Sequence, residues 1–263
     1  MCGNFPSVTL SLTPGGGTAP YTVAWDGGGT ALQKTVTAAG TYTVTLTDAA
    51  GCTLRKEIVV PATLGAKTFY VATTGSDAGA GTQAQPFRSI QYAVDNACDG
   101  DVIILARGVH AGSVDFKGKG LTLRSDYSGT VPTAADIAET IVEGQQDGLP
   151  VLTLNGGQSV VKGLTVRNGT TDGIYLLNRV DARLSDVLTT GHAGNGISGY
   201  YAATGDRYLR FERVRSTTNR GSGCSVFQTD VVAVGCEFSG NGYAGYSNPQ
   251  SSNPTRMYDT VIS

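Results

Sequence analysis

Three charged side chains recur at one step of a degenerate repeat in the second half of the chain. Asp186, Arg213 and Glu237 each directly precede an apolar residue. Those apolar residues, which recur at similar intervals, are Val187, Val214 and Phe238. If successive repeats stack, the charged residues form an acid–base–acid column with a step of about 5 Å.

Such a column, with Arg215 beside it, has two possible roles. Charged side chains held together in this way can take part in proton transfer or bind a ligand, which makes Asp186, Arg213, Arg215 and Glu237 the candidate catalytic residues. The structural alternative is a surface ion ladder that contributes roughly a few tenths of a kcal/mol per pair. Both interpretations need the same stacking.

Arginine and an aromatic residue cluster one repeat away from Asp186. Arg207, Tyr208 and Arg210 lie close together in the sequence. Guanidinium groups form forked hydrogen bonds with carboxylates and also stack on flat groups. These three residues are the predicted substrate-binding set, with an acidic glycan as the ligand. Solvated charges at the outward positions of a coil are the structural alternative.

Composition narrows the class of protein. The chain has 263 residues, of which 37 are glycine, and only 15% are charged. Lys and Arg number 19 against 21 Asp and Glu, so the net charge of −2 predicts no general attraction to nucleic acid or anionic membranes. No apolar run approaches the roughly 20 residues of a membrane span. The composition favours turn-rich β-structure.

Metal ligands are sparse. Cys98, Cys224 and Cys236 lack Cys-x-x-Cys spacing, so no zinc site is predicted. Asp172, Asp186 and Asp206 fall in neighbouring repeats at different steps, whereas Ca²⁺ needs about six or more converging oxygens. The prediction is therefore no metal site, with Ca²⁺ as the one cation left open.

One histidine stands in a predicted turn. His192 lies in Thr190-Gly191-His192-Ala193-Gly194, a stretch rich in small residues. A lone loop histidine is more typical of a solvated side chain than of a catalytic group. The expectation is a solvated His192.

The repeat itself predicts a parallel β-helix. The same glycine-led step recurs at nearly regular intervals, as Gly173-Ile174-Tyr175, Gly196-Ile197-Ser198 and Gly223-Cys224-Ser225. The intervals match the length of one coil of a parallel β-helix, and coils stack at roughly 4.8 Å. About five or six coils fit in the available length, and the stretch 131–138 is expected to bulge outward as a loop or short helix.

Alternation assigns the faces within a coil. Leu209 and Phe211 are predicted to point inward, so Arg210 points outward. The alternation breaks at Arg213 because Val214 is again apolar, which indicates a corner between two strands. Asparagine tolerates the left-handed backbone of such corners, and the predicted corner ladder consists of Asn168, Asn219 and Asn241.

The N-terminal stretch 1–64 forms a separate pattern. Alternating runs at 8–12, 21–25, 41–46 and 57–60, separated by glycine-rich turns, predict a small two-sheet sandwich around Trp25. The pattern Gly-Gly-Thr-x-Pro-Tyr-Thr-x-x-Trp, followed by Ala-Gly-Thr-Tyr-Thr-Val-Thr-Leu-Thr-Asp-x-x-Gly-Cys, resembles the SprB-type repeat. This immunoglobulin-like module occurs in surface proteins of gliding Bacteroidetes, so the resemblance implies a cell-surface or extracellular protein.

Two cysteines bracket this module. In an exported protein Cys2 and Cys52 can form a disulfide, and closing a loop of this length stabilises by roughly 4 kcal/mol. Two unpaired thiols are the alternative.

The N-terminus has no signal-peptide pattern, and the end at residue 263 reads as the middle of a strand, so we expect a fragment of a longer protein or an end covered by another copy.

Residues 69–110 carry a second resemblance. A strand at 69–73 precedes helical spacing of Phe87, Ile90, Ala93, Val94 and Ala97, and a strand follows at 101–105. The order Gly-Ser-Asp, Gly-Thr, Pro-Phe, Ile-x-x-Ala, Gly-Asp-x-Ile, Gly-x-His is similar to the opening segment of pectate-lyase-like right-handed parallel β-helix proteins, with His110 in place of the usual Tyr. In that family a helix caps the first coil.

These patterns together predict an all-β protein. A small immunoglobulin-like sandwich at 1–64 is followed by a right-handed parallel β-helix at 65–263, with an N-terminal capping helix. Polysaccharide lyases of the resembled family use a cation, often Ca²⁺, and a Lys or Arg base. The leading hypothesis is engagement of an acidic polysaccharide on the outer face, with turnover undecided. The alternative is a non-catalytic adhesin or filament component.

Overall fold

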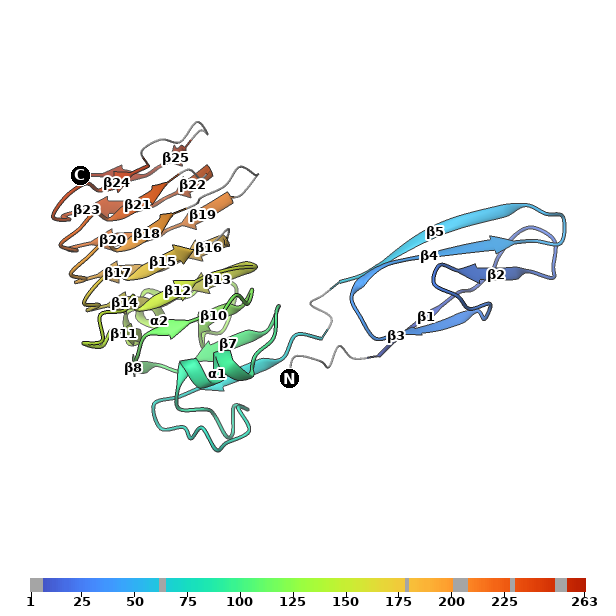
Figure 1. Ribbon diagram of the computed structural model, residues 1–263, viewed down its shortest axis with the longest axis horizontal. Helices are drawn as coiled ribbons and strands as arrows, with labels where there is room; N and C mark the ends of the chain where they lie inside the picture. The colour runs from blue at the N-terminus through green and yellow to red at the C-terminus, as the bar shows by residue number, and fades with distance from the viewer. Residues whose placement is uncertain (1–6, 62–64, 178–179, 201–207, 228–229, 249–254) are drawn as a thin grey trace. The chain divides into compact units, whose positions relative to one another are not determined.

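The structure, a computed structural model, describes residues 7–61, 65–177, 180–200, 208–227, 230–248 and 255–263 (Figure 1). It divides into two compact units, Met1–Ala66 and Lys67–Ser263. Each unit has its own hydrophobic core. In the part of the chain that is described, no helix is long and apolar enough to cross a membrane.

The N-terminal unit consists of two antiparallel sheets. One sheet pairs β1 (Val8–Ser11) with β3 (Gln33–Val36), and the other has the order β2 (Thr22–Trp25), β4 (Gly40–Thr47), β5 (Thr53–Val60). Both sheets contribute to one core, which contains Leu10, Val23, Trp25, Val36, Val44 and Val60. The sequence pattern misses β3 because only one of its four side chains is buried.

Cys52 lies directly before β5, and its position is set by a turn. Its amide donates to Asp48 Oδ1 (2.8 Å), and the other carboxylate oxygen of Asp48 accepts from the Thr18 amide (3.0 Å). Cys52 is an exposed free thiol, so the disulfide predicted between Cys2 and Cys52 is not formed in this structure. Cys2 itself lies outside the described residues.

The C-terminal unit is a parallel β-helix with three sheets, which confirms the architecture predicted by the repeat. Sheet I contains β6 (Thr68–Val71), β7 (Val102–Leu105), β10 (Thr122–Ser125), β13 (Gln158–Lys162), β16 (Asp181–Ser185), β19 (Tyr208–Glu212), β22 (Asp230–Val234) and β25 (Arg256–Tyr258). Sheet II contains β8 (Gly108–Ala111), β11 (Thr140–Glu143), β14 (Thr165–Arg167), β17 (Leu188–Thr190), β20 (Arg215–Thr217), β23 (Glu237–Ser239) and β26 (Val261–Ile262). Sheet III contains β9 (Val114–Asp115), β12 (Leu152–Leu154), β15 (Ile174–Leu177), β18 (Ile197–Tyr200), β21 (Cys224–Phe227) and β24 (Tyr246–Ser247).

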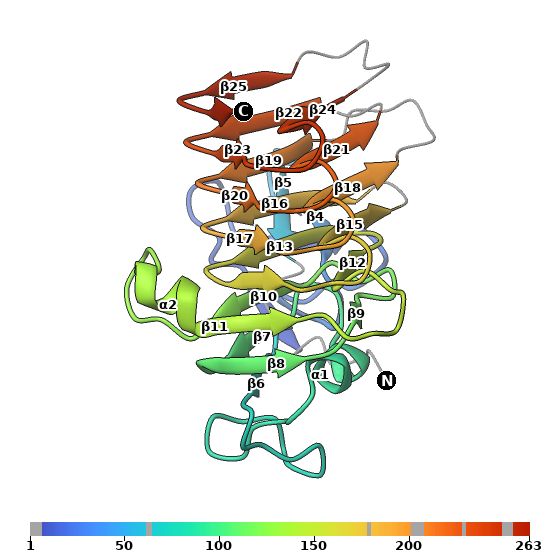
Figure 2. The same ribbon diagram turned by 90° about the vertical axis from the view of Figure 1, so that its left-hand side faces the viewer.

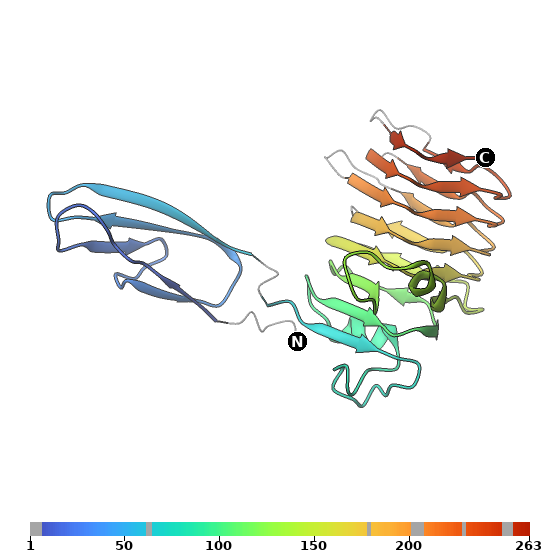
Figure 3. The same cartoon turned by 180° about the vertical axis from the view of Figure 1, so that it is seen from behind.

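The coils stack in chain order from β6 to β25 (Figures 2 and 3). Inward side chains form continuous columns through the stack. One column in sheet I consists of Ile103, Leu123, Val161, Leu184, Phe211, Ala233 and Met257. Leu209 and Phe211 are fully buried and Arg210 is exposed, as the alternation predicts.

Register confirms one predicted series and corrects the other. Ile174, Ile197 and Cys224 pair in successive coils. Phe238, in contrast, belongs with Ser216, Thr189 and Val166 rather than with Val214. The sequence pattern aligned Glu237 with Arg213. In the structure Glu237 instead pairs with Arg215.

Left-handed residues mark the corners. Arg213 (φ 53°) and Asp186 (φ 55°) occupy the corner between sheets I and II, where Gly163 and Gly235 also have positive φ. Asn168 (φ 58°) lies at the corner between sheets II and III. The break in alternation at Arg213 therefore is a corner, as predicted.

Two short helices accompany the first coils. Helix α1 (Ile90–Asn96) begins at Ser89, whose Oγ accepts from the Tyr92 amide, and it buries Ile90, Ala93 and Val94 in the β-helix core. Helix α2 (Ala134–Glu139) projects from the connection between β10 and β11 (Figure 2). It accounts for the outward bulge expected at 131–138.

We predict that Phe211→Ala lowers the free energy of unfolding of the β-helix by about 3–5 kcal/mol. Phe211 is completely buried and its ring lies edge-to-face with Phe238, with centroids 6.5 Å apart, so truncation leaves a cavity between two coils. Urea unfolding monitored by circular dichroism measures the change. The neighbouring exposed change Arg210→Ala is the control, and an equal loss in both variants would contradict the inward assignment.

Candidate functional site

The outer surface of sheet I carries a cluster of cations. Outward positions of β10, β13, β16 and β19 present Arg124, Lys162, Arg183 and Arg210, which we call the basic face. Arg183 lies directly opposite Arg210 on the next strand, and Arg124 lies directly opposite Lys162. Successive side chains of a strand point to opposite faces of the sheet. These cations therefore point outward, because the residues next to them along the strand point into the core.

The basic face differs in charge from the chain as a whole. Its four cations are accompanied by two carboxylates on the same strands, Asp181 and Glu212, which leaves a local surplus of two positive charges. The complete chain has a net charge of −2. A surplus of positive charge on one surface of a negatively charged protein attracts anions to that surface.

A shallow pocket of about 260 Å³ lies on this face. It is lined by Gln158, Val160, Asp181, Arg183 and Arg210, among others, from three successive coils. Arg183 has no ion-pair partner among the described residues. One oxygen of Asp181, Oδ1, is buried without a hydrogen bond within the described part of the chain.

Arg210 is partly neutralised. Its Nε donates to Glu212 Oε1 (2.5 Å). That hydrogen bond lowers the pKa of Glu212, with further lowering from the charges of Arg183 and Arg213. Glu212 therefore stays ionised and orients Arg210 across the pocket. Of the other predicted binding residues, Tyr208 lies on β19 and Arg207 lies outside the described residues.

Tyr127 adds an aromatic ring at one margin of the basic face. Its ring centroid lies 5.1 Å from the Arg124 guanidinium carbon and 5.4 Å from Lys162 Nζ. Such cation–π contacts hold both side chains over the ring. Lys162 Nζ also donates to the carbonyl of Thr130 (3.0 Å), which ties the face to the connection before α2.

The residues predicted to be catalytic form two separate ion pairs. Arg213 donates twice to Asp186, from Nε (2.6 Å) and from Nη2 (2.8 Å). Arg215 Nε donates to Glu237 Oε2 (2.9 Å) on the outer surface of sheet II. The predicted single column does not exist, because Glu237 stands opposite Arg215.

The Asp186–Arg213 pair is poorly suited to proton abstraction. The Asp186 side chain is only 5% exposed and accepts both guanidinium bonds. This pairing raises the pKa of Arg213 above its ordinary value, so Arg213 holds its proton more firmly than a free arginine. In this arrangement the pair locks one corner of the β-helix.

His192 occupies a buried ladder rather than a solvated loop, which corrects the sequence expectation. The residue is 1% exposed. Nδ1 accepts from the Gly169 amide (2.9 Å), and Nε2 lies 3.2 Å from the Val166 carbonyl oxygen. These partners assign a neutral ring with its proton on Nε2.

The same ladder continues through asparagines in the following coils. The His192 amide donates to Asn219 Oδ1 (3.2 Å), and Asn219 Nδ2 donates to Asn241 Oδ1 (3.0 Å). The predicted asparagine ladder is thus confirmed for Asn219 and Asn241. Asn168 is not part of the ladder. It lies one residue earlier in its coil, at a position with a left-handed backbone conformation.

Among the described residues, no three His, Cys, Asp or Glu side chains form a group that could hold a metal ion. Asp172 accepts hydrogen bonds from Asn195 and Ser198, and Asp186 is engaged by Arg213. Asp206, the third aspartate considered for Ca²⁺, lies outside the described residues.

Sequence reasoning missed most of the basic face. Arg183 could have been found, since it precedes Arg210 by the same interval that separates Val187 from Val214. Lys162 and Tyr127 carry no comparable signal. Tyr127 lies in an irregular connection that no repeat predicts.

The class of protein follows from this geometry: an all-β protein whose larger unit is a parallel β-helix. Its solved structural neighbours include a pectate lyase, Pel9A, at 15% identity and TM-score 0.49, with 74% of this chain and 62% of that chain covered. A rhamnogalacturonan lyase matches at 14% identity and TM-score 0.41, over 73% of this chain and 62% of its own. The pectin methylesterase PemA from Erwinia chrysanthemi matches at 15% identity and TM-score 0.42, over 63% of this chain and 55% of its own.

This chain therefore spans about three fifths of the length of the pectate lyase. Comparison with models of protein families and with curated protein sequences gave no match. These likenesses concern the fold and assign no role to any residue.

We predict that the free energy of unfolding falls as the pH decreases from about 6.5 to about 4. Burial lowers the pKa of His192 from 6.5 to about 4, so the unfolded chain takes up a proton in this window and the folded chain does not. The difference corresponds to about 3 kcal/mol at most, present in full above pH 6.5. Chemical denaturation at both ends of the window measures it.

The matched variant is His192→Asn. Asparagine occupies the same ladder step in the next two coils, at Asn219 and Asn241, so the variant retains the ladder without a titrating group. Its stability should lose this part of the pH dependence. Equal acid sensitivity in the two proteins would show that His192 is not responsible.

Proposed function

We propose that the β-helix unit binds an acidic polysaccharide on the basic face. The observation that carries the proposal is the placement of Arg183 opposite Arg210, two like charges that destabilise each other unless an anion lies between them. Glu212 forms a hydrogen bond with Arg210, whereas it interacts with Arg183 through charge alone. A sugar carboxylate that accepts forked hydrogen bonds from Arg183 would relieve this repulsion.

The spacing of the cations suits a polymer. Strands of neighbouring coils lie about 4.8 Å apart, and the basic face presents two cation pairs, Arg124 with Lys162 and Arg183 with Arg210, that are offset by two residues along the strands. The pocket beside Asp181 gives room for a ring, and Tyr127 offers an aromatic surface at the margin. A glycan with one carboxylate per sugar matches this arrangement better than a small anion does.

The setting that we propose is outside the cell or at its surface. The resemblance of residues 1–64 to the SprB-type repeat supports an immunoglobulin-like surface module, and the position of α1 on the first coil supports a cap. In this proposal the N-terminal unit displays the β-helix, and the β-helix contacts the glycan.

Binding without cleavage is the second candidate, and the ion pairs favour it. Arg213 and Arg215, the two predicted bases, are each held by a carboxylate. A non-catalytic adhesin or filament component needs only the basic face. A polysaccharide lyase would need a base beside the bound sugar, and Asp181 is the carboxylate that lines the pocket.

We predict that Arg183→Ala weakens binding to polygalacturonate on the order of tenfold to a hundredfold, because each charge-assisted hydrogen bond contributes about 1.5–3 kcal/mol. Isothermal titration calorimetry measures the affinity, which should also fall with added salt. Arg220→Ala is the control, since Arg220 is an exposed arginine on another face. Equal effects of both variants, or equal binding of neutral dextran, would refute the proposed site.

Turnover is tested separately from binding. The full chain is incubated with polygalacturonate, with Ca²⁺ in one arm and a chelator in the other, and ultraviolet absorbance reports new double bonds. An increase that disappears in Asp181→Asn identifies a lyase. Binding with no increase in either arm identifies the adhesin or filament role.

A further inference from the structure

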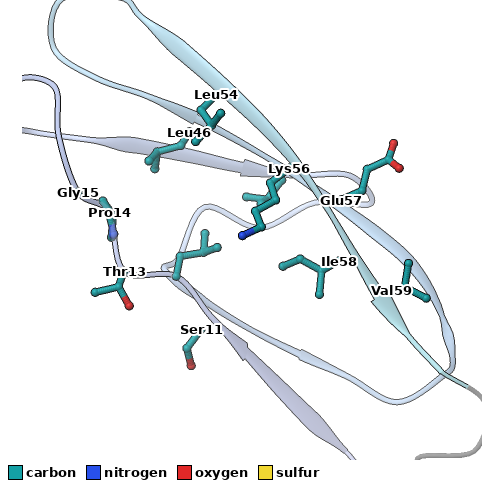
Figure 4. Close-up of a pocket in the computed structure, with 12 residues that line it drawn as sticks. Ser11, Thr13, Pro14, Gly15, Leu46, Leu54, Lys56, Glu57, Ile58 and Val59 are labelled. Carbon is teal, nitrogen blue, oxygen red and sulfur yellow. The ribbon is translucent and has the colours of Figure 1, made fainter.

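The two-sheet N-terminal unit is open along one side. In the described residues β1 pairs only with β3, and β5 pairs only with β4, so each has a free edge. The opposite side is closed, because the Trp25 indole donates to the Ala31 carbonyl (2.9 Å) between β2 and β3. A groove of about 730 Å³ lies between β5 and the segment from Ser11 to Gly15 (Figure 4).

The groove exposes apolar surface. Leu12, Leu46, Leu54 and Ile58 line it, and the Leu54 residue is 64% exposed. These side chains belong to the inner faces of the two sheets. Leu54 and Ile58 lie on the same face of β5 as the buried Val60, and Leu54 pairs with Leu46 on β4. The apolar inner surface thus continues beyond the part that the two sheets cover.

Lys56 is the exception on this inner face. It stands directly opposite the buried Val44, and its side chain extends into the groove between those of Leu54 and Ile58 (Figure 4). No hydrogen bond or ion pair engages its ammonium group within the described part of the chain. Its neighbours Arg55 and Glu57 lie on the outer face and pair with each other at 3.3 Å.

We propose that the free edge of β5 binds an extended segment of another polypeptide whose inward side chains read apolar, acidic, apolar. The unpaired backbone groups of an eight-residue edge strand are satisfied by a β-strand. Successive inward residues of that strand meet Leu54, Lys56 and Ile58, because cross-strand neighbours share a face. The carboxylate pairs with Lys56, and the two apolar side chains fill the groove.

A different role for Lys56 makes opposite predictions. Natural proteins place inward-pointing charges on edge strands to prevent uncontrolled pairing with other chains. If Lys56 only has that role, the edge accepts no strand, and removal of the charge leads to self-association. The inferred site instead requires that the charge select the partner.

The experiment uses two synthetic peptides with the full chain. Thr-Val-Thr-Glu-Thr-Val-Thr presents the proposed pattern, and Thr-Val-Thr-Lys-Thr-Val-Thr reverses its charge. We expect the glutamate peptide to bind on the order of tenfold more tightly, since attraction replaces repulsion at one cross-strand pair. Fluorescence anisotropy of labelled peptides measures affinity, and hydrogen exchange of residues 53–60 locates the bound strand.

Charge reversal supplies the decisive comparison. Lys56→Glu should invert the preference between the two peptides, whereas Arg55→Glu, an identical charge change on the outer face, should leave it unchanged. Circular dichroism confirms that each variant is folded. The proposal is overturned if neither peptide binds, if Lys56→Glu does not alter the preference, or if Lys56→Val makes the chain self-associate without peptide selectivity.

Discussion

Backbone hydrogen bonds between successive coils are the constraint on which the β-helix depends. Once they set the register, the neighbours of a side chain in the coils before and after it are the residues at the same step. This is why Arg183 faces Arg210, why Arg215 meets Glu237, and why His192 lies under Asn219. The position of a corner therefore decides the chemistry of every outer surface.

The two charged surfaces of the β-helix illustrate the consequence. At the corner between sheets I and II and on sheet II, each arginine meets a carboxylate, as in Asp186–Arg213 and Arg215–Glu237. Such pairs complement each other and leave little to offer a ligand. On the outer surface of sheet I, arginine stacks on arginine and lysine on arginine. In our proposal an external anion offsets the repulsion between these like charges.

The two units handle exposed strand edges differently. Strands inside the β-helix stack have a neighbour in the coil on either side, and among the described strands only the first and last of each sheet has a single neighbour. The N-terminal unit has only short sheets and leaves the long strand β5 unpaired on one side. Lys56 stands at the middle of that edge, where a charge either selects a partner strand or rejects all of them.

We could predict from the amino-acid pattern the two-unit organisation, the parallel β-helix, the helix near Ile90 and the corner at Arg213. These features follow from local periodicity and turn residues, which are visible along the chain. The folded chain was needed to show that Phe238 aligns with Ser216, that Glu237 pairs with Arg215, and that His192 is buried. Connections of unequal length shift the register between coils, and no local pattern records that shift. The partners of an outward or corner residue are therefore settled only when the coils stack.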